Sequence, residues 1–230
     1  MRTISKRLLK ERAKVDNRLL YDVTNALKLV KATSSAKFNE SIEAHISLNL
    51  DPKYADQQLR TTVILPHGTG RSIKIAVLST PDKIDIAKAA GADIVGTDDL
   101  VEEISKGILD FDLLIATPEM MPKLAKLGRV LGPKGLMPSP KAGTVSTDLE
   151  QTIKDFKRGK LEYRVDKTGI VHISFGKKIF SEDQLSDNLY AFYRSVEKNK
   201  PPGVKGKYIK NLAICSTMGP SIFIDLSSLV

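Results

Sequence analysis

The sequence predicts an α/β protein in which an α+β domain, built from both ends of the chain, carries an inserted α/β domain. Two observations lead to this prediction. The first is charge: the 230-residue chain has a formal net charge of +9, of which residues 1–70 carry +5, residues 71–158 carry zero and residues 159–230 carry +4. The second is a change in the spacing of apolar residues near the same two positions. The charge pattern alone is equally compatible with a random fluctuation along the chain. The change in apolar spacing therefore decides in favour of an inserted domain.

The first part of the chain predicts two helices and two strands. Residues 5–15 predict a basic helix or arm, and residues 19–31 predict a helix because apolar residues recur there at helical spacing. Those apolar residues are Leu19, Leu20, Val23, Ala26, Leu27 and Val30. Apolar and polar side chains alternate over residues 41–48, which is typical of a strand buried on one face. A second strand is predicted over residues 59–65.

The middle of the chain predicts a small parallel sheet. Its strands are nearly continuous apolar runs, over residues 73–78, 92–95 and 111–117. Helices are predicted between and after them, over residues 81–90, 98–106 and 148–157. Strands buried on both faces and separated by helices are typical of parallel α/β units, so we expect a three-layer, Rossmann-like domain. Residues 119–143 are rich in Gly, Pro and Lys and predict irregular structure.

After residue 159 the pattern becomes antiparallel. Residues 161–165 and 170–175 predict a hairpin around a turn at residues 166–169, where Gly169 supplies the positive φ that such turns need. Ser181 and Gln184 have the spacing of a capping box at the start of a helix. Its apolar face contains Leu185, Leu189, Phe192 and Val196. A basic loop and two closing strands follow, over residues 200–207, 208–215 and 222–226. The predicted domains are therefore residues 1–68 with 159–230, and residues 69–158.

Composition excludes several classes of protein. One cysteine excludes an intrachain disulfide and a cysteine-cluster zinc site, and we expect no metal or cofactor. The longest apolar runs are too short to span a bilayer, and no apolar run follows the basic N-terminus as it would in a secretory signal. We expect a soluble protein of a reducing compartment that makes no contact with membranes. A sequence pI of about 9.5 makes a polyanion the first partner to consider.

Catalysis finds little support in the sequence. His45 lies on the polar face of a predicted strand, His67 in a turn and His172 in a hairpin strand, and none has a nucleophile nearby in sequence. Cys215 follows Ile214 in a strand and is predicted to be a buried or half-buried core residue. The middle domain contains neither glycine-rich phosphate-loop motif, which argues against a nucleotide-dependent enzyme. Residues 132–135 have the GxxG form of an RNA-backbone clamp, but a rigid loop that exposes Lys134 is the simpler interpretation.

Basic residues in the loops of the two end segments point to RNA. They are Lys37, Arg164, Lys167, Lys205, Lys207 and Lys210. Lysine and arginine bind phosphates, whereas a specific RNA site also needs groups that reach ribose hydroxyls and pack on exposed bases. Residues 216–220 offer two hydroxyls, an apolar methionine and a glycine that allows close approach. An ordinary connection between strands explains the same residues, and physics alone does not choose between the two.

Several long motifs then show a resemblance. The strongest is KLGRVLGPKGLMP, residues 126–138. Others stand at residues 36–40, 65–70, 90–96, 112–121, 165–169 and 216–220. With these motifs the chain resembles, over essentially its whole length, the bacterial-type large-subunit ribosomal protein L-one family. Residues 51–63 are similar to the cyanobacterial and plastid versions. Cys215 and Asn39 depart from the pattern, where Ser and Asp are common.

The resemblance implies the L-one fold, with a terminal RNA-binding domain and an inserted domain, and no enzymatic activity. It implies direct binding of large-subunit rRNA and a place in the mobile stalk beside the exit site, where release of deacylated tRNA is assisted. The implied RNA-binding residues are Lys37, Phe38, Glu40, Ser41, Arg164, Asp166, Lys167, Gly169, Ser216, Thr217, Met218, Gly219 and Pro220. Thr217 and Met218 are expected to touch RNA, whereas Glu40 and Asp166 orient neighbouring groups or accept from ribose hydroxyls. Lys134, Lys205 and Lys207 are expected as secondary contacts.

The resemblance also bears on partners and compartment. Outside the ribosome we expect a monomer, and inside it contacts with other large-subunit proteins. An alternative role is repression of translation by binding of the free protein to its own mRNA. The implied compartment is the plastid stroma, and bacterial cytoplasm is the alternative. Two chain crossings near residues 68–71 and 158–160 are expected to act as a hinge between the domains.

Overall fold

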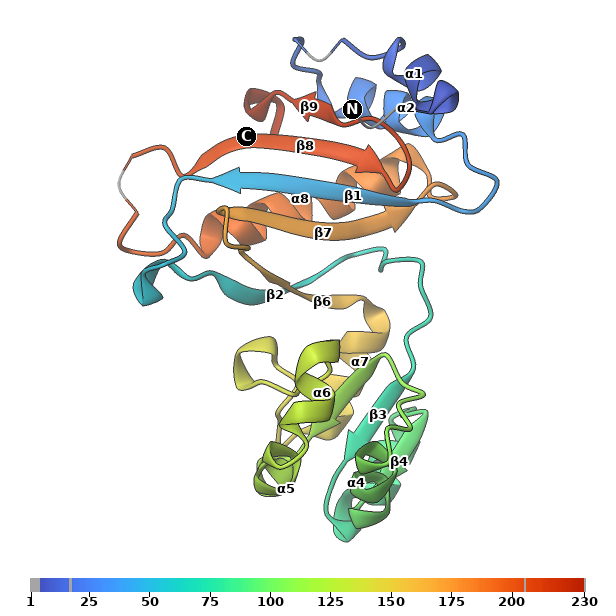
Figure 1. The fold of residues 1–230 in the computed structure, drawn as a ribbon, viewed down its shortest axis with the longest axis vertical. Helices are drawn as coiled ribbons and strands as arrows, with labels where there is room; N and C mark the ends of the chain where they lie inside the picture. Colours follow the sequence, from blue (N-terminus) through green and yellow to red (C-terminus); the bar gives the residue numbers. More distant parts are fainter. Residues whose placement is uncertain (1–4, 17, 205, 230) are drawn as a thin grey trace. The chain divides into compact units, whose positions relative to one another are not determined.

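A computed structural model of the chain describes residues 5–16, 18–204 and 206–229. The chain divides into two compact units. The terminal unit contains residues 1–70 and 161–230, and the inserted unit contains residues 71–160. These boundaries fall two residues after the predicted ones. The structure has the mixed helix and sheet content that was predicted (Figure 1).

The terminal unit is built around a four-stranded antiparallel sheet with the order β7-β1-β8-β9. Its strands are β1 (Ser41–Leu48), β7 (Ile170–Lys177), β8 (Ile209–Ser216) and β9 (Ile222–Ile224). The alternation predicted for residues 41–48 is confirmed, because every second side chain of β1 is buried. Those side chains are Ile42, Ala44, Ile46 and Leu48. Since side chains alternate across a strand, the four residues between them lie on the opposite face.

Helices cover one face of this sheet. They are α2 (Val23–Thr33) and α8 (Glu182–Lys198), and Figure 1 shows α8 behind the strands. The predicted capping box at the start of α8 is confirmed, with both the Ser181 and the Gln184 hydrogen bonds present. The four predicted apolar residues of α8 are completely buried in the core of this unit. The terminal unit also contains a short basic helix, α1 (Lys6–Arg12). Its second sheet has two strands, β2 (Arg60–Ile64) and β6 (Lys160–Arg164).

The inserted unit has a parallel three-stranded sheet between two layers of helices. Its strand order is β4-β3-β5, from β3 (Ile75–Leu78), β4 (Ile94–Gly96) and β5 (Leu113–Ala116). The helices are α3 (Ile84–Ala89), α4 (Asp98–Ser105), α5 (Met121–Ala125), α6 (Gly128–Lys134) and α7 (Leu149–Arg158). One face packs on α4, α5 and α6, and the other face packs on α3 and α7. The three-layer α/β prediction is therefore confirmed.

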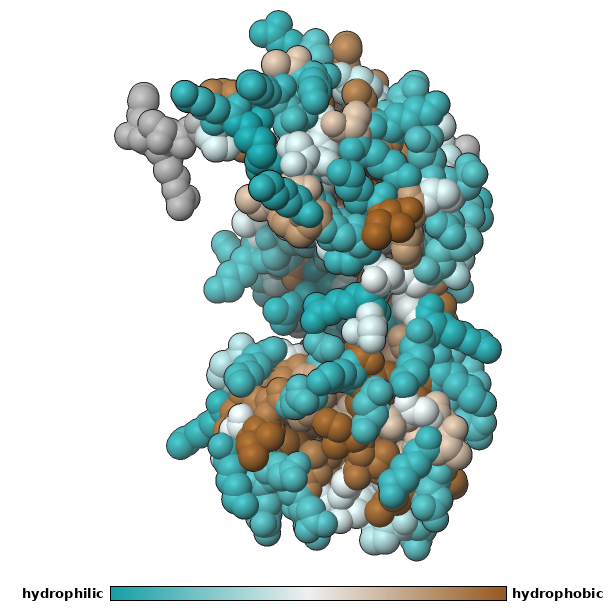
Figure 2. All heavy atoms as spheres, turned by 90° about the vertical axis from the view of Figure 1, so that its right-hand side faces the viewer, coloured by the Kyte–Doolittle hydropathy of each residue, from teal (hydrophilic) through white to brown (hydrophobic). Residues whose placement is uncertain are grey.

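The surfaces of the two units differ in polarity. In the view of Figure 2, hydrophobic side chains gather on the inserted unit, whereas the terminal unit is mainly hydrophilic. Charge differs in the same sense. The terminal unit has 22 basic and 14 acidic side chains, a formal net charge of +8, and the inserted unit has 14 and 13, a net charge of +1. No helix within the described ranges is long and apolar enough to cross a membrane.

Four predictions about local structure were wrong. Leu19 and Leu20 precede α2 and are exposed, because Tyr21 pairs with Phe223 and Asp225 through backbone hydrogen bonds and so holds the chain extended. Residues 119–143 contain α5 and α6. The spacing of Met120, Leu124, Leu127 and Leu131 is helical and outweighs the Gly and Pro content, because all four side chains pack on the sheet.

The other two errors concern the closing segments. The predicted hairpin of residues 161–175 has its turn, but its strands separate after a single bridge between Val165 and Val171. β6 then pairs with β2, and β7 pairs with β1. Cys215 is half-buried on the side of β8 that faces away from the core, because the buried residues of β8 around it are Ile214 and Ser216.

Candidate nucleic-acid interface

Two segments that are far apart in the sequence meet at the start of β1. We call residues 36–41 and 216–220 together the loop junction. The Thr217 N–H donates to the Ser41 carbonyl at 3.0 Å. The Ser41 N–H donates to Thr217 Oγ1 at 3.0 Å, and this hydroxyl lies 3.2 Å from the Ser41 carbonyl. The Thr217 side chain therefore fixes one segment against the other.

Glu40 is the second connection within the loop junction. Its carboxylate is completely buried and accepts from the Ala36 N–H at 2.8 Å and from the Met218 N–H at 3.0 Å. Burial opposes ionisation of this carboxyl. The two N–H groups, the neighbouring Ser216 hydroxyl and Lys178 outweigh burial, so the pKa of Glu40 lies below its usual value. Glu40 is therefore an ionised group that positions both loops.

The side chains that the loop junction presents to solvent are Lys37, Phe38, Asn39, Thr217 and Met218. Phe38 is 53% exposed and Met218 is 49% exposed, although both are large apolar residues. An apolar ring and a thioether beside a lysine can pack on an unstacked base while the lysine meets a phosphate. The loop junction therefore offers the group types that single-stranded or looped RNA needs.

The remaining predicted residues of residues 216–220 have structural positions. Ser216 and Pro220 are buried. A Cβ atom at Gly219 would lie 2.4 Å from Ser216 Oγ, so a larger residue there requires the Ser216 hydroxyl to move. All three are in the predicted RNA-binding set, in which Gly219 was expected to permit close approach and Pro220 to stiffen the loop. In the structure the side-chain positions of all three shape the loop.

Two basic residues at the loop junction were missed. Arg7 of α1 donates to the Met218 carbonyl and to Ser35 Oγ, each at 3.1 Å. Lys177 at the end of β7 donates to Ser41 Oγ at 2.7 Å. Nothing in the sequence signals either contact, because Arg7 lies 211 residues from Met218.

A second group of predicted residues lies at the other end of β1. The Leu48 N–H donates to the Gly169 carbonyl at 2.9 Å, which places the turn at residues 166–169 beside the last residue of β1. At about 3.3 Å per residue, the eight residues of β1 separate this turn from the loop junction by roughly 23 Å. The structure therefore does not bring the two predicted groups together.

Asp166 organises this turn, which we call the Asp166 turn. One carboxylate oxygen accepts from the N–H groups of Thr168 and Ile170, each at 2.8 Å. The Ile170 N–H is the main cause that lowers the pKa of Asp166 to about 2, and Thr168 and His172 add to it, while burial opposes the shift. Gly169 has a φ of +82° and is packed on the carbonyls of Leu48 and Leu50.

The exposed cations at the Asp166 turn are Arg164, the last residue of β6, and Lys167, within the turn. Lys207 is also exposed. It lies at the same end of the sheet, since the carbonyl of its neighbour Tyr208 accepts from the N–H of Asn49, the residue after β1. Lys205 lies outside the described residues. Lys134 is exposed at the last position of α6 in the inserted unit, and it is part of a helix end rather than of a rigid loop.

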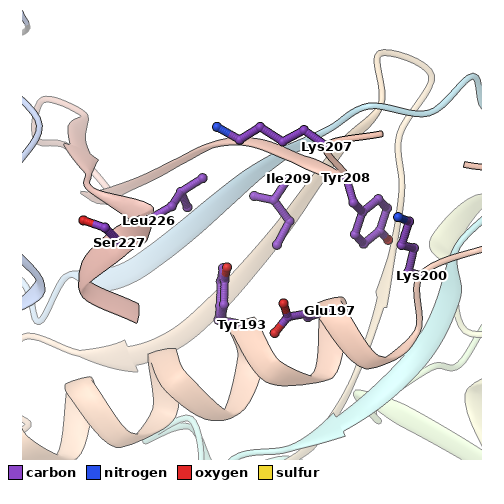
Figure 3. A pocket seen from close by; sticks show the side chains of 8 residues that line it. All are labelled: Tyr193, Glu197, Lys200, Lys207, Tyr208, Ile209, Leu226 and Ser227. Atoms are coloured by element: carbon purple, nitrogen blue, oxygen red, sulfur yellow. The ribbon is translucent and has the colours of Figure 1, made fainter. Parts of the chain in front are cut away.

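A pocket of about 420 Å³ lies between α8 and the start of β8 (Figure 3). It is lined by Tyr193, Glu197, Lys200, Lys207, Tyr208, Ile209, Leu226 and Ser227. Burial raises the pKa of Tyr208 to about 12, and burial also raises the pKa of Tyr193. Both phenols therefore stay protonated near neutral pH, and they supply no general base to this pocket.

The histidines do not form an activated nucleophile within the described chain. His67 Nε2 lies 2.9 Å from Asp187, in an exposed pair. His45 Nε2 lies 3.2 Å from Cys215 Sγ. Burial is the main cause that raises the pKa of Cys215 to about 11, with Glu43 adding to it. The thiol is therefore protonated at neutral pH, unlike the thiolate of a catalytic cysteine.

Comparison with known proteins agrees with this non-catalytic surface. Residues 30–220 match the family model described as "Ribosomal protein L1p/L10e family". The chain is 60% identical over 227 residues to "Large ribosomal subunit protein uL1c" of Trieres chinensis, with 99% of each chain covered. It is 58% identical over 228 residues to "Large ribosomal subunit protein uL1" of Prochlorococcus marinus strain MIT 9312, with 99% of this chain and 97% of that one covered. A family of ribosomal proteins, not of enzymes, is also what the resemblance implied. The chain belongs to the ribosomal protein L1p/L10e family.

Proposed function

We propose that the chain is a structural component of the large ribosomal subunit and binds large-subunit rRNA through its terminal unit. The names of its relatives, each a large ribosomal subunit protein, support the place of assembly. The observation that carries RNA binding is the loop junction. There Glu40 and Thr217 hold two distant segments so that Lys37, Phe38 and Met218 stand exposed together.

Charge and shape have separate roles in this proposal. The +8 of the terminal unit attracts any RNA, because cations release counterions from phosphates regardless of sequence. Selection of one RNA requires contacts to unstacked bases and ribose hydroxyls, which Phe38, Met218 and the Thr217 region supply. The cations of the Asp166 turn and Lys207 give a second phosphate contact at the far end of the sheet, and Lys134 gives a weaker one.

The inserted unit has a different role in this proposal. The chain passes between the two units twice, at residues 70–71 and 160–161. Two crossings are suited to a hinge. We propose that the terminal unit is clamped on rRNA and that the inserted unit moves as part of the stalk beside the exit site, where it assists release of deacylated tRNA. The uL1c and cyanobacterial relatives favour a plastid or cyanobacterial ribosome.

A filter-binding titration with matched aromatic variants tests the RNA site. Phe38 is 53% exposed in the loop junction, and Tyr54 is 60% exposed in the same unit but outside it. Loss of base stacking costs about 1–3 kcal/mol per aromatic residue. We expect Phe38→Ala to weaken binding to the cognate rRNA fragment by that amount, and Tyr54→Ala to leave it unchanged. Equal affinities of the two variants would remove the loop junction from the RNA site.

A kinetic measurement tests the role in tRNA release. Ribosomes lacking this protein and ribosomes reconstituted with it are loaded with labelled deacylated tRNA at the exit site. We expect slower dissociation of the tRNA without the protein. An unchanged rate would contradict the release role while leaving rRNA binding standing.

A further inference from the structure

A cluster of metal-ligating side chains lies on the open face of the four-stranded sheet, the face that the helices leave uncovered. Glu43 and His45 are on β1, Cys215 is on β8 and His172 is on β7. In the sheet register Glu43 is opposite Cys215, and His45 is opposite His172. Side chains two residues apart on a strand share a face, so the register brings all four together.

The distances within the cluster are short. His45 Nε2 lies 3.2 Å from Cys215 Sγ. Glu43, His45 and Cys215 each offer a ligand atom, and these three atoms lie within 4.8 Å of one another. All three residues are half-buried, so the ligand atoms are partly shielded from water but accessible to an ion from the open face.

We propose that Glu43, His45 and Cys215 form a binding site for Zn²⁺. An imidazole, a thiolate and a carboxylate are the three ligand types that zinc takes in proteins. Zinc–nitrogen and zinc–sulfur bonds of about 2.1 and 2.3 Å place the two ligand atoms about 3.6 Å apart on a tetrahedral ion, so a small side-chain rotation accommodates it. Three protein ligands leave the fourth position open to water or to a phosphate oxygen.

His172 and Asp166 orient the His45 ligand. His172 Nδ1 lies 2.8 Å from His45 Nδ1, and His172 Nε2 lies 3.5 Å from Asp166 Oδ2. When His172 turns its Nε2–H toward the Asp166 carboxylate, its Nδ1 is an acceptor. His45 then donates its Nδ1–H, which leaves the lone pair of His45 Nε2 directed at Cys215. A hydrogen-bond acceptor that fixes the tautomer of a ligating histidine is typical of zinc sites, and here His172, oriented by Asp166, is that acceptor.

Binding of Zn²⁺ at this site changes no oxidation state, so it needs no oxidant or reductant. The Cys215 thiol loses its proton to solvent as the zinc–sulfur bond forms. His45 binds as a neutral imidazole, with Nε2 as the ligand atom and Nδ1–H donated to His172. No metal site is expected from the sequence, because a single cysteine excludes a cysteine cluster. The histidine and the carboxylate of β1 meet that cysteine of β8 only through the pairing of two strands that are distant in the chain.

Cobalt is the probe for the test, because a thiolate bound to Co²⁺ gives a charge-transfer absorption band in the near ultraviolet. The full chain, without an affinity tag and with its thiol reduced, is titrated with Co²⁺ and then with Zn²⁺. We expect one equivalent of Co²⁺ to give the band and one equivalent of Zn²⁺ to remove it. Zinc should also raise the melting temperature, because it binds the folded chain.

Variants assign the band to the cluster. Cys215→Ser keeps the size of the side chain and is expected to abolish the band and the zinc-dependent rise in melting temperature. His172→Phe is expected to keep the band but weaken zinc binding about 10- to 100-fold, as losses of an orienting residue do. His67→Ala, a histidine of the same unit paired with Asp187, is the control and should bind as the unaltered chain does.

Either of two results would overturn the site. The first is the absence of a thiolate band, with no stoichiometric zinc binding to the folded chain. The second is zinc binding that Cys215→Ser leaves unchanged, which would place the ion elsewhere. Circular dichroism of each variant checks that the fold is intact, so a loss of the band in a folded variant is attributed to the ligand.

Discussion

The two larger sheets of this protein are covered differently, and the difference explains where function resides. The parallel sheet of the inserted unit is covered by helices on both faces, so Ile75, Ile115 and their neighbours are all buried. The antiparallel sheet of the terminal unit is covered on one face only. Its other face carries polar residues, among them Glu43 and His45. When helices cover both faces of a sheet, only the helix surfaces and the loops can bind a partner. When one face is uncovered, the strand side chains of that face can bind a partner as well.

Charge follows the same division. The unit with the open sheet face has a net charge of +8, and the unit with the covered sheet has +1. The loop junction and the Asp166 turn stand at the two ends of β1, on the unit that carries the excess charge. We therefore expect damage to the terminal unit to impair RNA binding and equal damage to the inserted unit to spare it.

The largest expected effect separates the two cores. Ile46 on β1 and Ile115 on β5 are both completely buried. Truncating a buried isoleucine to alanine costs about 2–5 kcal/mol. All six tyrosines lie in the terminal unit, so tyrosine fluorescence reports its unfolding in urea and circular dichroism reports both units. We expect Ile46→Ala to move the fluorescence transition to lower urea concentration. We expect Ile115→Ala to leave the fluorescence transition in place and to move only the part of the circular dichroism transition that comes from the inserted unit.

RNA binding of the same two variants sharpens the comparison. Under conditions where both units are folded in the unaltered chain, Ile46→Ala should weaken rRNA binding in proportion to the unfolded fraction of the terminal unit. Ile115→Ala should bind with unchanged affinity. If Ile115→Ala weakens binding as much as Ile46→Ala does, the inserted unit contributes to the RNA site as strongly as the terminal unit.

The next effect concerns Glu40, which connects the two segments of the loop junction. Glu40→Ala leaves the N–H groups of Ala36 and Met218 without their acceptor in a buried position. Each such orphan group costs about 1–3 kcal/mol, so we expect a loss of stability in the fluorescence transition and a loss of RNA affinity. Glu43→Ala, which removes a half-buried carboxylate of β1 three residues further along the chain, is the control, assayed without added metal. Equal losses in the two variants would contradict the positioning role of Glu40.

The sequence was sufficient for the elements whose signal is local. The alternation of residues 41–48 and the Ser181 capping box depend on neighbours a few residues apart, and both are present. The sequence also allowed the segments of the loop junction to be named, because family motifs mark them. The sequence was insufficient for long-range pairing. The turn between β6 and β7 is of the hairpin type, yet β6 pairs with β2 and β7 pairs with β1, because the packing of distant segments decides which strands pair.

The same limit applies to the site. Thr217 and Glu40 were named as RNA-binding residues, yet their contacts with Ser41 and Met218 join residues 176 and 178 positions apart in the chain, which meet only in the fold. Arg7 and the His45–Cys215 contact were invisible for the same reason. Residue type indicates what a side chain can do, and the fold alone decides which partner it meets.

Thr217 gives a smaller effect than Glu40, because its side chain is exposed and water can replace part of its bonding. Thr217→Ala removes the hydroxyl that receives the Ser41 N–H. We expect rRNA affinity to fall by about 1–3 kcal/mol, as for loss of a hydrogen bond at a specific contact. Thr147→Ala, an exposed threonine of the inserted unit, should bind normally in the same filter assay. An affinity unchanged by Thr217→Ala would show that Ser41 is held in place without it.

Salt dependence compares one cation from each unit. Removing a lysine that contacts phosphate lowers the slope of log affinity against log salt by about 0.7–0.9. We expect Lys37→Ala to reduce the slope by that amount and Lys134→Ala, at the end of α6, to reduce it by less. Titrations at several salt concentrations give both slopes. Equal reductions would extend the main RNA footprint onto the inserted unit.

The smallest effect is a pH dependence that the Asp166 turn confers on the terminal unit. The Ile170 N–H and the other groups around the carboxylate lower the pKa of Asp166 to about 2 from its usual 3.8. A carboxyl whose pKa is lower in the folded state stabilises the fold when it is ionised, and that contribution is lost as pH falls through the two values. The Asp166 contribution is therefore present above about pH 4 and lost toward pH 2.

Tyrosine fluorescence of the terminal unit measures this contribution. Urea midpoints between pH 5 and pH 2 should fall more steeply for the unaltered chain than for Asp166→Ala. The difference is small because the Asp166 side chain is 38% exposed and solvent screens it. Lys167→Ala, which changes the next residue of the turn, should keep the steeper dependence. Parallel pH profiles for the unaltered chain and Asp166→Ala would mean that the pKa of Asp166 is the same in the folded and unfolded chain. The ionised carboxylate would then add no stability to the Asp166 turn.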